Sequence, residues 1–244
     1  MQRIYDGLKE GLSSLRLSFT HLVYPSFCLQ CEELLPPEHA NFCRGCAECL
    51  ERILPSERCP FCFLPKSSAT LCPRCRVFPL FFHGVASVFD YQGPAAMLIK
   101  KLKYGNLPLL ASGMASFLVL QWLELNWPTP DIVVPVPQFF LRTLQRGYNQ
   151  SELLAQEFSK QLQIPTRNVL KRNFGGFRQA NLNLEQRQKL HTDSFSMRRG
   201  MDISNKTILM IDDVLTSGAT LKQCGVVLKK GGATQLYALT FCRT

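Results

Sequence analysis

The stretch ILMIDDVLTSGATL, residues 208–221, constrains the fold most, because an apolar run leads into two acids and then into small residues. A continuous apolar run is typical of a strand that is buried on both faces of a parallel sheet. The Thr, Ser and Gly residues that follow are typical of a loop that opens a helix. We therefore predict that a buried strand ends on the two acids and leads through a short loop into a helix.

The chain after residue 80 repeats this alternation of strand and helix patterns. Such alternation predicts an α/β fold in which helices cover both faces of a parallel sheet. A basic stretch at 172–200 is rich in residues that favour loops. The other strands are expected at 85–91, 131–137 and 234–243, and the helices at 94–105, 107–125, 149–163 and 218–232.

Such sheets bind ligands at the carboxyl ends of their strands, where a loop enters a helix. Unpaired N–H groups and the helix dipole favour a phosphate there. Asp212 and Asp213 would repel a phosphate in contact, whereas a ribose diol with Mg²⁺ near it would satisfy both acids. A capped helix beside two solvated acids is the alternative, but it does not explain acids at the buried end of an apolar run. The predicted phosphate-binding residues are Thr216, Ser217, Gly218, Ala219 and Thr220.

Eight of the eleven cysteines form four CxxC pairs between residues 28 and 75. Two intervening residues let a tight turn aim both sulfurs at one ion, and zinc takes four thiolates. We predict two closed, structural zinc sites, with sequential pairing favoured over cross-bracing because its loops are shorter; reduced, buried cysteines are the alternative. Cys49 or His39 could replace a ligand, whereas Cys224 and Cys242 fit core positions. The predicted ligands are Cys28, Cys31, Cys43, Cys46, Cys59, Cys62, Cys72 and Cys75.

The change of pattern near residue 80 predicts a division of the chain into three parts. Residues 1–25 are expected to form an amphipathic helix, residues 26–80 a small zinc-binding domain, and residues 81–244 the sheet domain. Charged residues interrupt the apolar residues of the first part, so neither a signal peptide nor a membrane span is expected there. We therefore predict a cytoplasmic protein without a membrane span.

The formal net charge of +10 favours partners that carry phosphate. Much of the excess of positive charge lies between residues 142 and 206, a segment that contains twelve basic and five acidic residues. This segment could be a solvated surface, but its position beside the predicted phosphate site equally favours a lining for phosphate groups.

The stretch at 208–221 resembles the phosphoribosyl pyrophosphate (PRPP) binding motif of type I phosphoribosyltransferases. Together with the CxxC pairs, FDYQGPAAMLIKKLKYG (89–105) and IVVPVPQFFLRTLQRGYNQSELLA (132–155) resemble the ComF family of competence-associated proteins. The resemblance runs from about residue 20 to the end. It implies a type I phosphoribosyltransferase-like sheet preceded by a Cys-rich zinc-binding domain. It also implies PRPP binding with Mg²⁺ and a role, with other competence proteins, in DNA uptake.

The resemblance assigns roles to individual residues. Asp212 and Asp213 would hold the ribose hydroxyls, and the loop at 216–220 would hold the 5′-phosphate. The pyrophosphate would meet the loop after VVPVP, where Arg142 and Arg146 offer forked donors to phosphate oxygens. These arginines could instead only close the turn before the next helix, for which Asn149 is the expected N-cap, with Glu152 completing a capping box.

The basic stretch resembles the flexible hood of the family. Gln179, Arg187 and Phe195 fall on the hood pattern, whereas Leu190 stands where the family usually has Asn. Lys103 matches a further family stretch and would reach the ligand or be solvated. Together with Arg142 and Arg146, the residues expected to contact pyrophosphate or nucleic acid are Gln179, Arg187 and Lys103.

Two classes of function follow from these residues. A transferase would displace pyrophosphate from the ribose with a nitrogen nucleophile, but no residue in the sequence identifies a base or the acceptor. A nucleic-acid binding module would use the same pockets for single-stranded DNA or a nucleotide without turnover. A PRPP-sensing regulator is a third possibility. Aromatic residues near the basic stretch, Phe139, Phe140, Tyr148, Phe174 and Phe177, would stack bases or serve the core.

Overall fold

The computed structural model describes residues 26–36, 41–66, 72, 75, 82–173 and 194–244. The expected amphipathic helix at 1–25 and the hood residues Gln179, Arg187 and Leu190 lie outside this part of the chain, as does His39. The division of the chain at residues 25 and 80 therefore stays a prediction.

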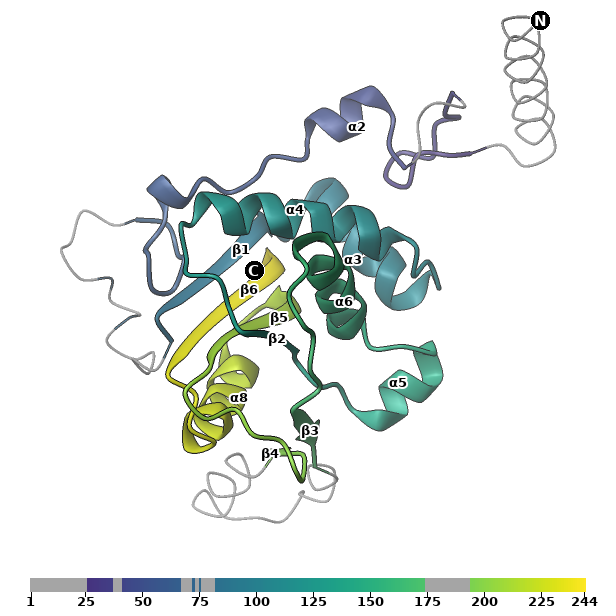
Figure 1. Cartoon of the computed structure of the whole chain (residues 1–244). Coiled ribbons are helices and arrows are strands. Elements are labelled where there is room, and N and C mark those ends of the chain that lie inside the picture. Colours follow the sequence, from purple (N-terminus) through teal and green to yellow (C-terminus); the bar gives the residue numbers. More distant parts are fainter. Residues whose placement is uncertain (1–25, 37–40, 67–71, 73–74, 76–81, 174–193) are drawn as a thin grey trace, which may run out of the picture.

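A four-stranded parallel sheet forms the centre of the molecule (Figure 1). Its strands are β1 (Gly84–Asp90), β2 (Ile132–Pro135), β5 (Thr207–Leu215) and β6 (Gln235–Arg243). They lie in the order β1-β6-β5-β2, and all three pairings are parallel. The predicted parallel sheet is confirmed, and β5, which contains the apolar run that begins at residue 208, lies inside it rather than at an edge.

Helices cover both faces of this sheet (Figure 1). One face carries α3 (Gly93–Tyr104), α4 (Leu110–Glu124) and α6 (Gln150–Leu162), and the other carries α8 (Ala219–Lys230). All four helices lie where apolar residues recur at helical spacing. The doubly covered sheet explains why its strands read as continuous apolar runs.

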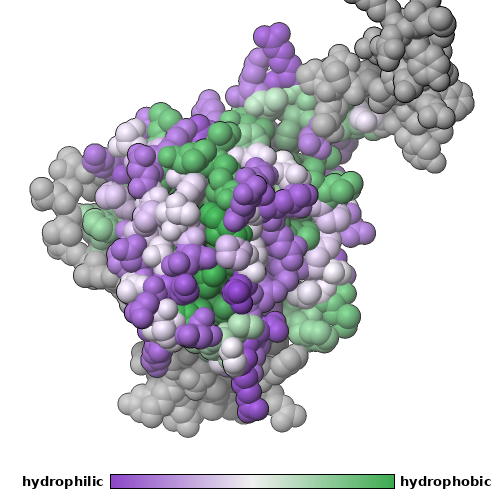
Figure 2. Space-filling view, viewed as in Figure 1, coloured by the Kyte–Doolittle hydropathy of each residue, from purple (hydrophilic) through white to green (hydrophobic). Residues whose placement is uncertain are grey.

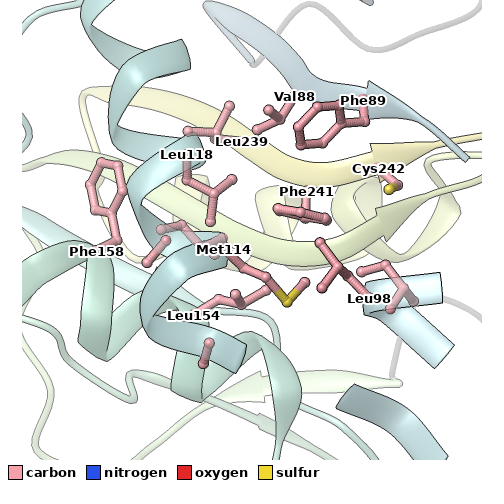
Figure 3. Close-up of a cluster of buried hydrophobic side chains, with 14 of the residues drawn as sticks. Val88, Phe89, Leu98, Met114, Leu118, Leu154, Phe158, Leu239, Phe241 and Cys242 are labelled. Carbon is pink, nitrogen blue, oxygen red and sulfur yellow. The ribbon is translucent and has the colours of Figure 1, made fainter. Parts of the chain in front are cut away.

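The hydrophobic core consists of one cluster on each face of the sheet. Along β5, Leu209 and Ile211 belong to the cluster under α3, α4 and α6, whereas Ile208 and Met210 belong to the cluster under α8. This alternation follows from the two-residue period of a strand. Figure 3 shows the first cluster, in which helix side chains meet the sheet: Val88, Phe89, Leu98, Met114, Leu118, Leu154, Phe158, Leu239, Phe241 and Cys242.

Several short elements were not predicted from the sequence, among them a 3-10 turn, η1 (Pro55–Glu57). The others are α2 (Arg44–Glu48), α5 (Phe140–Arg146), and the antiparallel strands β3 (Leu170–Arg172) and β4 (Phe195–Met197), which pair outside the main sheet. β4 lies within the basic stretch that we expected to be loop. Elements of three to seven residues span too few periods for an apolar pattern to reveal them.

The Cys-rich region packs directly on the sheet domain. The N–H of Ile53 donates to the carbonyl of Val88 at 2.8 Å, and the buried amide of Gln121 donates to the carbonyl of Ile53 at 3.0 Å. The side chains of Arg58 and Asp90 pair at 2.8 Å. No helix in the described part of the chain combines the length and the apolar character that a bilayer crossing requires.

Candidate functional site

Strand β5 carries Asp212 and Asp213 within its hydrogen-bonded ladder. Asp212 pairs with Thr240 of β6, and the pairing continues to Leu215, which lies opposite Arg243. The expectation that the strand ends on the two acids is therefore wrong. The ladder extends past them because Val214 and Leu215 continue the apolar pattern and have β6 partners, so the acids lie inside the sheet close to its carboxyl edge.

The two acids have different hydrogen-bond partners. The hydroxyl of Ser151, at the start of α6, donates to Oδ1 of Asp212 at 2.7 Å, and the N–H of Asp213 donates to the same oxygen at 2.9 Å. Asp213 is buried and accepts a hydrogen bond from Nζ of Lys103, at the end of α3, at 3.0 Å. The strand thus brings one acid to α6 and the other to α3.

One oxygen of Asp213 lacks a well-directed donor. Nζ of Lys103 is also 3.0 Å from Oδ2, but Oδ2 accepts no hydrogen bond from the described residues although it is buried. A buried acceptor without a well-directed donor is unfavourable, and the charge of Lys103 compensates for it in part.

Burial raises the pKa of Asp212 to about 7, and the negative charge of Asp213 adds to this shift. The hydrogen bonds from Ser151 and from the Asp213 N–H act in the opposite direction, as does the charge of Lys103. A cation bound beside the two carboxylates would favour the ionised form of Asp212. The pair therefore has both the oxygen donors and the electrostatic environment that suit Mg²⁺.

The predicted phosphate loop leads from β5 into α8. Thr216, Ser217 and Ala219 are exposed, whereas Gly218 is buried with φ +77° and is the N-cap of α8. This left-handed conformation favours glycine, because a Cβ would clash with the backbone. The N-cap glycine has no side chain to accept from the first turn of α8, and the hydroxyl of Ser217 accepts a long hydrogen bond, 3.4 Å, from the N–H of Ala219.

Lys103 and Arg146 line one cavity of about 580 Å³. The guanidinium of Arg146 lies 4.9 Å from the centroid of the Tyr104 ring and donates to the amide oxygen of Gln150 at 3.2 Å. Tyr148 closes the wall and donates to the carbonyl of Leu102 at 2.8 Å. Because Lys103 also contacts Asp213, this cationic cavity adjoins the acid pair.

The other predicted contacts are arranged differently. Arg142 is exposed on α5 and does not line this cavity. Its positive charge instead helps to lower the pKa of Arg172. The predicted N-cap Asn149 is confirmed, since its side chain accepts from the N–H of Ser151 at 3.1 Å. Glu152 accepts from the amide of Asn168 at 2.6 Å rather than closing a capping box.

The eight predicted zinc ligands gather in two groups, Cys28–Cys31–Cys43–Cys46 and Cys59–Cys62–Cys72–Cys75. Sequential pairing is therefore confirmed and cross-bracing is wrong. The Sγ atoms of Cys31 and Cys43 are 3.7 Å apart, and those of Cys59 and Cys75 are 3.4 Å apart. Four sulfurs about 2.3 Å from one zinc ion would be roughly 3.8 Å apart at tetrahedral corners, so both groups fit zinc.

The cysteines outside these two groups have other roles. The thiol of Cys49 donates to the carbonyl of Gly45, and Cys224 and Cys242 are fully buried in the core, as predicted. Within the second group, burial raises the pKa of Cys62 to about 11. A zinc ion would displace the thiol protons and bind the thiolates.

The second cysteine group lies against the phosphate loop. Cys62, Arg243, Thr216, Ser217 and Gly218 line one small crevice. Arg243 is buried and donates to the carbonyl of Cys62 at 3.0 Å, and it lies opposite Leu215 at the start of the loop. A buried charged side chain thus connects a predicted zinc site to the predicted phosphate site.

Curated relatives match the chain over most of its length. DNA utilization protein YhgH of Escherichia coli K12 is 28% identical over 236 residues, which cover 91% of this chain and 99% of the relative. Competence protein F of Haemophilus influenzae is 26% identical over 86% of this chain and 93% of its own length. Competence protein ComFC of Bacillus subtilis is 25% identical over 86% of this chain and 87% of its own length.

The chain is therefore homologous to these competence and DNA utilization proteins. This homology confirms the resemblance to the ComF family that the sequence motifs indicated. No family model matches the chain.

The solved structures that resemble the chain at low similarity include a PRPP amidotransferase and an adenine phosphoribosyl transferase. Glutamine PRPP amidotransferase from B. subtilis, complexed with ADP and GMP, has a TM-score of 0.43 and 15% identity, and the match covers 59% of this chain and 30% of the amidotransferase. Adenine phosphoribosyl transferase from Trypanosoma brucei, in complex with AMP, pyrophosphate and ribose-5-phosphate, has a TM-score of 0.37 and 16% identity. This match covers 61% of this chain and 56% of the transferase. Similarities this remote identify no function.

The raised pKa of Asp212 predicts a pH-dependent effect of Asp212→Asn. Between pH 3.8 and about pH 7, Asp212 keeps its proton in the folded protein but loses it in the unfolded chain. The free energy of unfolding therefore falls as the pH rises through this range. Without divalent cations, Asp212→Asn should raise Tm more at pH 8 than at pH 5. Asp202→Asn is the control, because the N–H of Ser204 lowers the pKa of exposed Asp202 and its effect should be equal at both pH values. A change in Tm on Asp212→Asn that is the same at pH 5 and pH 8 would contradict the prediction.

The crevice at Cys62 predicts that the two zinc sites differ in their effect on ligand binding. Cys31→Ser and Cys62→Ser should each lower the zinc content from two ions per chain to one, measured by elemental analysis. Only Cys62→Ser should weaken binding of ribose 5-phosphate, by roughly fivefold or more in calorimetry, because Arg243 connects that site to the phosphate loop. Unchanged zinc content in both variants would contradict the metal sites, and equal weakening would contradict the connection.

Proposed function

We propose that the chain binds PRPP or a related ribose phosphate together with Mg²⁺ and acts in DNA uptake. The residues at 216–220 would hold the 5′-phosphate, and Asp212 and Asp213 the ribose hydroxyls and the metal. Lys103 and Arg146 would contact the pyrophosphate. The cytoplasm is the proposed location, because its reducing conditions keep zinc-binding cysteines in the thiol form.

The arrangement of charges along β5 carries this proposal. The N-terminus of α8, a carboxylate pair and a cationic cavity follow one another, and Lys103 joins the last two through its 3.0 Å contact with Asp213. PRPP has the complementary sequence of groups: a phosphate, a diol and a pyrophosphate. The raised pKa of Asp212 further supports a cation at the acids, because a cation would favour the ionised carboxylate.

A transfer reaction at this site would depend mainly on positioning and charge. The groups just named would orient the ribose, and Lys103 and Arg146 would stabilise the pyrophosphate as it leaves. Bound Mg²⁺ would neutralise part of the pyrophosphate charge. Since no described residue is placed as a base for the acceptor, an acceptor that is already nucleophilic suits this site best.

The names of the relatives support the cellular role. Two of them are called competence proteins and a third a DNA utilization protein, and each matches at least 86% of this chain. We propose DNA uptake, with other competence proteins as partners, on this basis.

Helix α5 favours a second candidate function, the binding of single-stranded DNA. Phe140, Leu141 and Leu144 of this helix are 59%, 65% and 68% exposed. Figure 2 shows an apolar patch at the lower right, where Figure 1 places α5. Arg142 lies between Leu141 and Leu144 in the sequence of this helix. Exposed aromatic and basic side chains on one helix suit stacked bases and a phosphate backbone.

The PRPP proposal predicts a metal-dependent affinity that the acid pair provides. Titration calorimetry should detect PRPP binding only with Mg²⁺, and Asp212→Ala with Asp213→Ala should weaken it by about 100-fold or more, since hydrogen bonds to charged groups contribute roughly 1.5–3 kcal/mol each. Asp202→Ala, a change at an exposed acid, is the matched control and should leave the affinity unchanged. Equal affinity in the double variant and the control would overturn the proposal.

The DNA proposal predicts a different response. Fluorescence anisotropy should show binding of a single-stranded oligonucleotide that weakens steeply between about 50 and 200 mM salt. Phe140→Ala with Arg142→Ala should reduce this affinity and leave PRPP binding intact, because neither residue lines the cavity of Lys103. An affinity that does not change with salt, or that is unchanged in the double variant, would argue against DNA recognition by α5.

A further inference from the structure

A second cavity, of about 220 Å³, lies between the end of β2, helix α5 and strand β3. Pro137, Phe140, Asn168, Lys171 and Arg172 are among the residues that line it, and Lys103 is not. It is therefore separate from the cationic cavity that we assign to pyrophosphate. Its volume is below the roughly 300 Å³ at which pockets for drug-sized ligands begin, so it suits a ligand of about one ring.

Three basic residues line this second cavity, Lys171, Arg172 and Arg198, and Arg172 is the one that is not exposed. Its guanidinium lies 3.6 Å from the centroid of the Phe139 ring and 5.2 Å from that of Phe195, so aromatic rings hold it in place. Its Nε is buried and donates no hydrogen bond to any described residue. Because Nε is buried, the rest of the guanidinium would contact a ligand in this cavity.

The charge around Arg172 is poorly compensated. It forms no ion pair with an acid among the described residues, whose salt bridges all involve other side chains. Glu152, the acid in the lining, accepts a hydrogen bond from Asn168. Burial and then the charge of Arg142 lower the pKa of Arg172, so an anion here would relieve an unfavourable environment.

The walls of the second cavity favour a flat ligand. Pro137 and Phe140 contribute apolar surface, and the amides of Gln138 and Asn168 contribute polar groups at the edge. A planar guanidinium binds a carboxylate through parallel hydrogen bonds and stacks against flat groups, which a compact ammonium does not do.

We infer that the second cavity binds a small planar acid, a single aromatic or heteroaromatic ring that carries a carboxylate, with the carboxylate on Arg172. The charges of Arg172 and Asp212 interact, so the bound acid would lie near the proposed ribose site. The acid is expected to bind whether or not PRPP is present, so the absence of acid binding would leave the proposed PRPP site unaffected.

The test compares three simple probes in ligand-observed NMR titrations of the full chain. Benzoate has both the ring and the charge, benzamide has the ring without the charge, and acetate has the charge without the ring. Benzoate should bind at least about tenfold more tightly than either of the others. Equal binding of benzamide or acetate would overturn the inference, because a planar acid site requires both features.

Three substitutions locate the binding. Arg172→Gln should weaken benzoate binding by about tenfold or more, whereas Arg167→Gln, a matched change at an exposed arginine shortly before β3, should not. Asn168→Phe, at an exposed position in the lining, should block the cavity while keeping Arg172, and so tests the site even if Arg172→Gln impairs folding. Unchanged benzoate affinity in Asn168→Phe, or equal loss in both arginine variants, would overturn the assignment. PRPP titrations of the same variants report on the proposed function independently.

Discussion

The parallel pairing of β5 with β6 is the interaction on which the candidate site depends. It runs from Thr207 to Leu215 and holds Asp212 and Asp213 inside the sheet. It also places Arg243 beside the start of the phosphate loop, where its guanidinium binds the backbone of Cys62. One ladder of backbone hydrogen bonds therefore positions the acids, the loop and the contact with a cysteine cluster.

This position has an electrostatic consequence. Burial, and then the charge of Asp213, raises the pKa of Asp212 to about 7. One oxygen of Asp213 is buried and accepts no hydrogen bond from the described residues. Lys103 and Ser151 compensate for this only in part. Sites that bind charged ligands commonly retain such unfavourable groups, because the ligand completes the missing interactions.

Much of the fold follows from local patterns. Continuous apolar runs predicted the four strands of the main sheet, and helical periodicity predicted α3, α4, α6 and α8. The spacing of the CxxC pairs predicted two four-sulfur clusters, since two intervening residues favour a shared ion. By contrast, α5 and the β3–β4 pair are too short for periodicity to reveal, and their stability depends on contacts with distant segments.

The candidate site was predictable in part. The acids and the glycine at φ +77° carry a local signal, because a buried strand rarely contains two carboxylates and a left-handed turn favours glycine. Ser151 and Arg172 carry no such signal. A serine at a helix start and an arginine in a basic stretch are common, and only their contacts with Asp212 and with Phe139 distinguish them.

The sequence by itself determined the types of the main elements, the four CxxC pairs and the passage from a buried strand through a small-residue loop into a helix, because backbone geometry and short spacings impose these locally. Only the tertiary structure decided how far β5 continues past its acids, because the end of β5 pairs with β6. Helix α8 separates these two strands in the chain. The tertiary structure also decided that Lys103 binds Asp213 and that Arg243 binds Cys62, 110 and 181 residues away in the chain. Such contacts arise from the packing of several elements at once, and no local pattern records them.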